Sequence, residues 1–209
     1  MAPANHSAFG YTGANQEMGE TMRPTKRDEL VGKALRTFYA GGFHATGMDR
    51  LVEETGISKT SMYKHFRSKE DLILAALKLR DEQFRAWLFG RMAALGRTPR
   101  ERLLALFDAL AEWVAEPDFR GCMFVKAASE FQEAKDPIHA QAAAHKVLLF
   151  EHLKDLAAEA GAKEPAALAR QLLILKEGAI VTAQVEGRPE AAAEAKAAAE
   201  TLLDSALAH

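Results

Sequence analysis

The chain has 209 residues, of which 48% are hydrophobic and 27% charged, and its formal net charge is -2 at pH 7. This length can bury one sizeable core, or a small domain plus a larger one, and the slightly acidic balance argues against a general nucleic-acid coat. No apolar run reaches bilayer length, no signal segment opens the chain, and a single cysteine excludes an intramolecular disulfide framework, so we expect a cytoplasmic protein without a membrane partner.

Residues 1–22 lack hydrophobic periodicity and carry no Arg or Lys, and we interpret them as a flexible arm without a role in recognition. A helix is predicted to follow. Thr25 is placed to cap its start, and apolar residues step by four along its inner face. Gly41-Gly42 is expected to end it.

The next segment has the pattern of two helices joined by a tight turn. Met48 and Leu51 lie on one face of a helix predicted from about Gly47 to Thr55, and Gly56 can take the positive φ that ends it. Ser58 is placed to cap a second, short helix, whose Met62 and Phe66 should face inward. Two helices with a glycine-containing turn form a helix-turn-helix unit.

The outer face of the short helix carries lysines and small polar side chains. Ammonium groups suit phosphates, whereas Thr and Ser can approach base edges in the major groove without steric conflict. A charged, solvated helix face is the alternative, but the turn, the cap and a further cap at Ser68-Lys-Glu-Asp71 coincide here and favour DNA binding. The candidate DNA-binding residues are Thr46, Lys59, Thr60, Ser61, Tyr63, Lys64, His65 and Lys69.

The charge distribution agrees with this interpretation. Residues 23–80 hold 12 Lys and Arg against 7 Asp and Glu, whereas residues 81–209 hold 15 against 20. Positive charge is therefore concentrated on the segment assigned to DNA, as expected for a phosphate-binding module.

From Ser68 onward the pattern is helical. Helices are predicted over about 69–95, interrupted at Gly90, then 99–115, 121–131, 137–160 and 165–185, with a last alanine-rich helix after Gly187-Arg-Pro189. Thr98 and Pro99 open the second of these as cap and first helical residue. No segment shows sustained period-two alternation, so the chain is predicted to be all-α.

The N-terminal motifs resemble the DNA-binding domain of the tetracycline-repressor (TetR) family of bacterial regulators. The matching segments are Leu30–Phe43, Thr46–Val52, Ser58–Phe66 and Ser68–Leu72. The sequence departs from the family pattern at Met62, Gly47 and Val52, although Thr46 can still cap the second helix. The resemblance implies about nine helices, with a three-helix helix-turn-helix domain in residues 23–70 and a helical ligand-binding and dimerisation domain in residues 71–209.

The resemblance also implies the partners, namely a palindromic double-stranded operator, a small-molecule effector and a second copy of the chain. Such regulators usually dimerise through their last two helices. Here those helices carry apolar faces with interspersed small residues, although a core helix pair within a monomer would look the same. The faces in question comprise Leu168, Leu172, Leu175, Ala179 and Ala183, then Ala195, Ala198, Leu202 and Ala206.

Aromatic residues concentrate in the middle helices, together with a few polar ones, as in many small-molecule sites. The alternative is that these aromatic residues simply fill a helical core. The candidate effector-binding residues are Arg80, Phe84, Trp87, Phe107, Trp113, Cys122, Phe124, His145, Phe150 and Glu177. We expect the dimer to repress transcription by occupying the operator. An inducer bound among these residues would release it by changing the spacing of the two helix-turn-helix units.

Two other functions stay open. Cys122 could make the protein a redox-responsive regulator if Arg120 or Lys126 activates its thiol, although its apolar neighbours suggest an inert buried cysteine. Alternatively the helical part is an enzyme or a binding protein with a vestigial DNA module. The histidines show no metal-ligand spacing, and no phosphate loop or nucleophile motif is present. Glu130, Glu133 and Glu177 could meet in the fold as a carboxylate site, although glutamates on a helix surface are far more often solvated. No cofactor or metal is expected, and the protein is not expected to be an enzyme.

Overall fold

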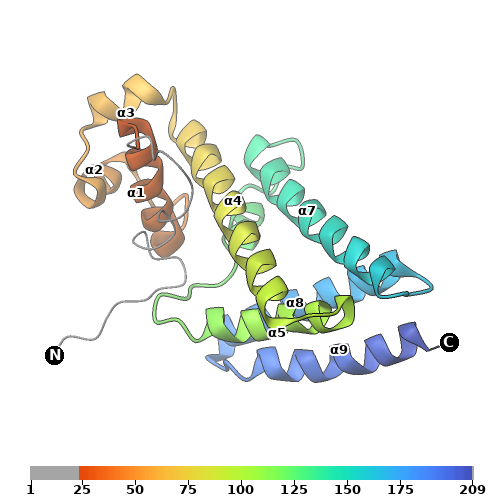
Figure 1. The fold of residues 1–209 in the computed structure, drawn as a ribbon. Coiled ribbons are helices and arrows are strands. Elements are labelled where there is room, and N and C mark those ends of the chain that lie inside the picture. Colours follow the sequence, from red (N-terminus) through yellow and green to blue (C-terminus); the bar gives the residue numbers. More distant parts are fainter. Residues whose placement is uncertain (1–23, 209) are drawn as a thin grey trace. The chain divides into compact units, whose positions relative to one another are not determined.

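The computed structural model describes residues 24–208, and within this range the chain folds into nine α-helices and no strand (Figure 1). The all-α prediction is confirmed. The predicted arm, residues 1–22, lies outside the described residues. The helices are α1 (Lys26–Gly41), α2 (Met48–Thr55), α3 (Lys59–His65), α4 (Lys69–Leu95), α5 (Pro99–Val114), α6 (Met123–Glu130), α7 (Pro137–Glu159), α8 (Pro165–Glu186) and α9 (Ala191–Leu207).

These helices form two compact units. Within the described residues, the first comprises 24–83 together with Met123–Ala143, and the second comprises Phe84–Cys122 with 144–208. Helices α4 and α7 each contribute residues to both units. The first unit therefore extends beyond the domain predicted for residues 23–70, because part of α4, all of α6 and the start of α7 are grouped with it.

Local capping explains where several helices begin. Thr25 and Asp28 form a reciprocal capping box at α1, and Thr98 and Glu101 form another at α5, where Pro99 is the first helical residue. Each box satisfies backbone N–H groups that have no partner inside the helix. Gly90 does not interrupt α4, which is continuous to Leu95. One glycine lowers helix propensity by only about 1 kcal/mol, which packing overrides.

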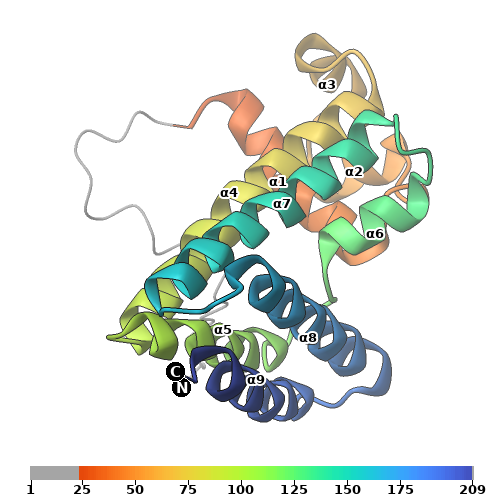
Figure 2. The ribbon, with the colours of Figure 1, turned by 90° about the vertical axis from the view of Figure 1, so that its right-hand side faces the viewer.

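Within the second unit, α5, α8 and α9 pack side by side, as both views of the ribbon show (Figures 1 and 2). The faces predicted to join two subunits partly serve this packing instead. Leu168, Leu172, Ala179 and Ala183 of α8 are buried within the chain, as is Ala195 of α9. The same apolar periodicity describes an internal core face and a subunit interface, so the sequence could not separate them.

In the part of the chain described, no helix combines the length and the apolar character that crossing a membrane requires.

Candidate nucleic-acid interface and effector site

The first three helices form a helix-turn-helix in which α1 supports the other two. The Lys33 ammonium of α1 donates to the Thr55 carbonyl at the end of α2 (2.9 Å), and the Arg27 guanidinium lies 4.8 Å from the centre of the Phe66 ring, after α3. Gly56 ends α2 with φ +68°, and its N–H donates to the Val52 carbonyl. A side chain at φ +68° would be strained, so glycine suits this turn.

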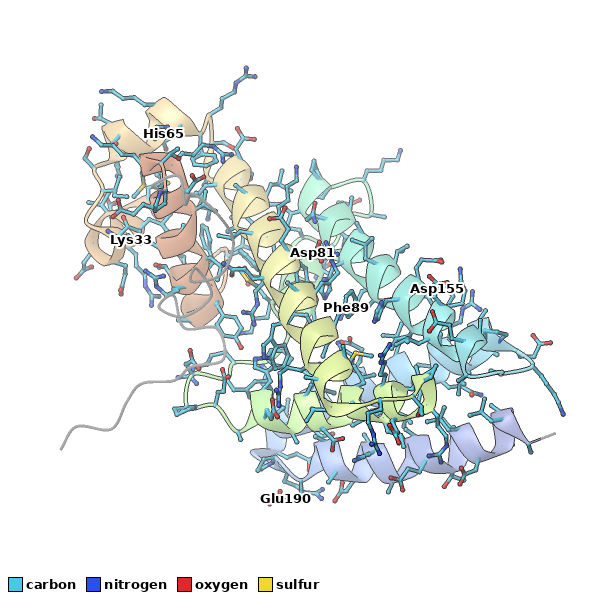
Figure 3. All side chains as sticks on the ribbon, in the orientation of Figure 1. Lys33, His65, Asp81, Phe89, Asp155 and Glu190 are labelled. Carbon is cyan, nitrogen blue, oxygen red and sulfur yellow. The ribbon has the colours of Figure 1, made fainter. Side chains whose placement is uncertain are left out.

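Helix α3 buries one side chain of its own and exposes most others. Met62 is buried, as predicted, and Ser58 caps the helix by accepting from the Ser61 backbone N–H. Because α3 has only seven residues, this single inward contact fixes which face is turned out. The outward residues are Lys59, Thr60, Tyr63, Lys64 and His65, with Ser61 half-buried; Figure 3 labels His65 on α3 and Lys33 on α1.

Lys59 at the start of α3 is tied to α2. Its ammonium lies 2.6 Å from Asp49 Oδ1, and this hydrogen bond raises the pKa of Lys59 above its ordinary value. Both side chains are largely exposed, so the pair is weak and salt-sensitive. A phosphate could therefore replace Asp49 as the partner of Lys59.

Two predicted DNA-binding residues have hydrogen-bond partners within the protein. Thr46 is completely buried and donates its hydroxyl to the Gly42 carbonyl (2.7 Å), so it neither reaches outward nor caps α2. The N-cap of α2 is Gly47, which forms no side-chain cap. Lys69, at the first turn of α4, donates to the carbonyls of Phe43 (3.1 Å) and Thr46 (3.4 Å). The motif placed both residues near the turn, but only the fold shows that the turn itself uses them.

The same turn is held by a residue that was not among the predicted DNA contacts. The Glu130 carboxylate, at the end of α6, accepts the backbone N–H groups of Phe43 (3.0 Å to each oxygen) and His44 (2.5 Å). The rings of His44 and Phe131 lie 4.6 Å apart between centroids. These contacts span more than eighty residues of sequence, so local patterns carry no signal for them.

In the second unit, four of the predicted effector residues form one aromatic cluster. Phe84 is at its centre, with its ring centroid 5.1 Å from that of Trp113, 5.7 Å from His145 and 5.7 Å from Trp87. Phe84, Trp113 and His145 are almost fully buried. Phe89, on the same helix and labelled in Figure 3, stacks on His152 of α7, with the two ring centroids 3.7 Å apart.

The other predicted effector residues are dispersed. Arg80 and Phe124 belong to the first unit, where Arg80 lies over the Tyr39 ring. Phe107 is buried in α5, and Phe150 is half-buried under the Arg170 guanidinium at 4.9 Å. Spacing along separate helices does not define which aromatic residues meet, and the effector role of these residues stays a prediction.

Two lysines that sequence reasoning missed connect the remaining predicted residues. Lys146 of α7 and Lys176 of α8 both donate to Glu177 Oε1, at 2.7 and 2.8 Å, and Lys146 also reaches the Cys122 sulfur at 3.5 Å. The cation beside Cys122 is therefore Lys146; Lys126 instead donates to the Tyr39 carbonyl. The sequence did contain one indication of Lys176: this lysine occupies a position on the apolar face of its helix, between Leu172 and Ala179.

The carboxylates considered for catalysis have other roles where the structure shows them. Glu130 holds backbone amides and Glu177 is paired with lysines. Between residues 24 and 208, no group of three or more His, Cys, Asp or Glu side chains is arranged to hold a metal ion. The geometry instead defines a helix-turn-helix DNA-binding protein joined to a helical unit with a buried polar cluster.

Comparisons with known proteins agree. Residues 30–76 match the family model for bacterial regulatory proteins of the tetR family, and residues 99–199 match the model for the tetracyclin repressor-like C-terminal domain. The HTH-type transcriptional regulator YjdC of Escherichia coli is 24% identical over 74% of this chain and 81% of its own length.

Two solved structures extend the likeness to the fold. A TetR-type transcriptional regulator from Streptomyces avermitilis is 32% identical, with a TM-score of 0.79, over 88% of this chain and all of that one. A TetR-family regulator from Streptomyces coelicolor is 29% identical, with a TM-score of 0.80, over 87% of this chain and 95% of that one. The chain belongs to the TetR family and is a DNA-binding transcriptional regulator, from a family that is not enzymatic.

Proposed function

We propose that the protein is a ligand-responsive repressor that binds a palindromic operator as a homodimer and is released by a small-molecule inducer. The observation that carries the DNA half is the outer face of α3, which presents Thr60, Tyr63, Lys64 and His65 to solvent on a capped, rigid support. A helix of seven residues makes few contacts. Two copies placed about one DNA turn apart would read two half-sites.

An exposed apolar stripe on α8 supports the homodimer. Ile174, Val181 and Val185 are 71%, 46% and 76% exposed, and with Gly178 they follow a spacing of four, three and four residues along one helix face. A side chain at Gly178 would meet no atom within 4 Å. Exposed β-branched residues around a glycine suit a close helix-to-helix contact, and we assign this stripe to the second copy.

The proposal that a ligand regulates DNA binding rests on two features: the polar cluster of the second unit, and the helices that connect the two units along the chain. Helix α4 contributes to both units, and α6, whose Glu130 holds the turn before α2, follows directly after Cys122. An inducer that binds one arrangement of these helices better shifts the population toward it, by no more than its differential affinity. A coupling of about 1–3 kcal/mol, roughly 5–150-fold, is typical.

Selection of bound fragments from a random duplex library tests the DNA half. We expect a palindrome whose half-sites are about one turn apart, bound with a steep salt dependence. A featureless pool, bound weakly, would refute operator recognition and favour a helical binding protein with a vestigial DNA module.

The dimer is tested with Val181→Glu, which should give a monomer by sedimentation and lose operator binding. Leu95→Glu is the matched control, because Leu95 is 44% exposed but lies at the end of α4 and is not part of the stripe on α8. Equal behaviour of the two variants would contradict the assignment of the interface to α8.

The hydrogen bond from Lys146 to the Cys122 sulfur favours one second candidate, a redox-responsive regulator, because a neighbouring cation stabilises a thiolate. Cys122 is buried, however, with 6% of its surface exposed. Thiol labelling of the folded protein distinguishes a redox-responsive regulator from a ligand-responsive one, since an unreactive Cys122 would exclude redox sensing.

A further inference from the structure

The polar cluster in the second unit has more positive than negative charge. The ammonium groups of Lys146 and Lys176 converge on one carboxylate oxygen, Oε1 of Glu177, while Oε2 of the same carboxylate is buried and has no hydrogen-bond partner. Two cations therefore share a single anion, and Cys122 adds a thiol rather than a second carboxylate.

Lys176 is the least satisfied member of this cluster. Its side chain is 1% exposed, and within the described part of the chain its ammonium donates one hydrogen bond, to Glu177. An ammonium carries three N–H donors. Buried charges are ordinarily paired and hydrogen-bonded, because leaving them otherwise is costly.

The titration behaviour agrees with this geometry. Burial lowers the pKa of Lys176 despite the attraction of Glu177. Burial alone would raise the pKa of Glu177, but the two ammonium groups outweigh it and hold the pKa at about 2. Both ammonium groups thus rely on the single charge of Glu177, at its Oε1, and a further negative charge beside Lys176 would supply a second counter-ion.

The surroundings of this charge are apolar and aromatic. The Lys176 ammonium lies 5.6 Å from the centroid of the Phe84 ring, and Phe84 is packed against Trp113 and His145. An anion that reached Lys176 would therefore meet aromatic surface on the same side. An entering anion would lose its hydration, and this cost is smaller for a singly charged group than for a doubly charged phosphate.

We propose that the effector is an organic monoanion, a carboxylic acid with a compact apolar or aromatic body. Its carboxylate pairs with Lys176 and Lys146, and its body packs against Phe84. This inference rests on the proposed function and specifies the chemical class of its ligand. The carboxylate would supply acceptors for the unused Lys176 donors and could take Lys146 away from the Cys122 sulfur.

The test measures the thermal unfolding midpoint of the purified protein without DNA, at constant ionic strength. The probes are sodium benzoate and sodium hexanoate, and benzamide and hexanamide are their uncharged matches. An acid at about 100 times its dissociation constant should raise the midpoint by about 5–10 °C, and the amides should not.

Variants locate the binding. Lys176→Met should abolish the response, and Lys146→Met provides a second test if the first variant does not fold. Lys163→Met, at an exposed lysine before α8, should respond like the wild type. Equal shifts with acids and amides, no shift with either acid, or a shift retained in both lysine variants would each overturn the proposal.

Operator binding does not enter this measurement. A palindrome recovered by selection together with no acid response would refute the ligand class alone. An acid response without a palindrome would refute operator recognition and leave the anion site standing.

Discussion

Replacing Glu177 by Gln removes the single carboxylate shared by Lys146 and Lys176 while preserving its shape. The pKa of Glu177 is held at about 2 against an ordinary value of 4.5. A difference of roughly 2.5 units corresponds to about 3 kcal/mol of stability at neutral pH. We therefore expect Glu177→Gln to lower the free energy of unfolding by about 3 kcal/mol, because the buried Lys176 and the half-buried Lys146 lose their counter-ion.

For Lys176→Met, in the same cluster, we do not expect the loss of stability that Glu177→Gln causes. Lys176→Met removes the surplus cation and leaves Lys146 paired with Glu177, so stability should change by less than about 1 kcal/mol or rise. Glu112→Gln is the control for removing a paired carboxylate. The Glu112 pair with Arg91 is 44% and 36% exposed, so its loss should cost at most about 1 kcal/mol.

The assay is urea unfolding followed by circular dichroism, at one fixed protein concentration because a dimer's stability depends on it. The pKa of Glu177 is depressed, so its contribution is complete above about pH 5 and is lost as the pH falls toward about 2. The difference between wild type and Glu177→Gln should shrink over that window. A loss no larger than that of Glu112→Gln, or a difference independent of pH, would refute the electrostatic reasoning.

Four further substitutions, one of them with a matched control, address the DNA-binding unit. Ser58→Ala removes the cap of α3 and should cost about 1 kcal/mol in urea unfolding, with operator affinity reduced too; unchanged stability would contradict the role of the cap. Glu130→Gln should speed hydrogen exchange of the two amides it holds roughly 5–30-fold, by NMR, whereas Glu133→Gln, at an exposed position, should not. Lys64→Ala should flatten the salt dependence of DNA binding by about one unit per lost phosphate contact without changing stability. Lys69→Ala should lower stability as well, because its ammonium holds two carbonyls, and identical behaviour of the two lysine variants would contradict this division.

The sequence by itself determined the local structure of the DNA-binding unit. Thr25, Ser58 and Thr98 cap the helices predicted for them, and Gly56 adopts the positive φ required at the turn. Met62 faces inward as its spacing predicts. Capping, turns and helix periodicity involve residues only a few positions apart, so a single sequence contains all the information they need.

Contacts between distant segments were decided only by the tertiary structure. Lys69 and Thr46 were predicted to touch DNA, which stays a prediction, and the contacts of both with backbone carbonyls appear only in the fold. Glu177 and Cys122 were identified individually, while Lys146 and Lys176, which join them, were not. Which helix faces meet depends on how separate helices pack, and that choice sets the charge balance of the buried cluster, a property that no single helix carries.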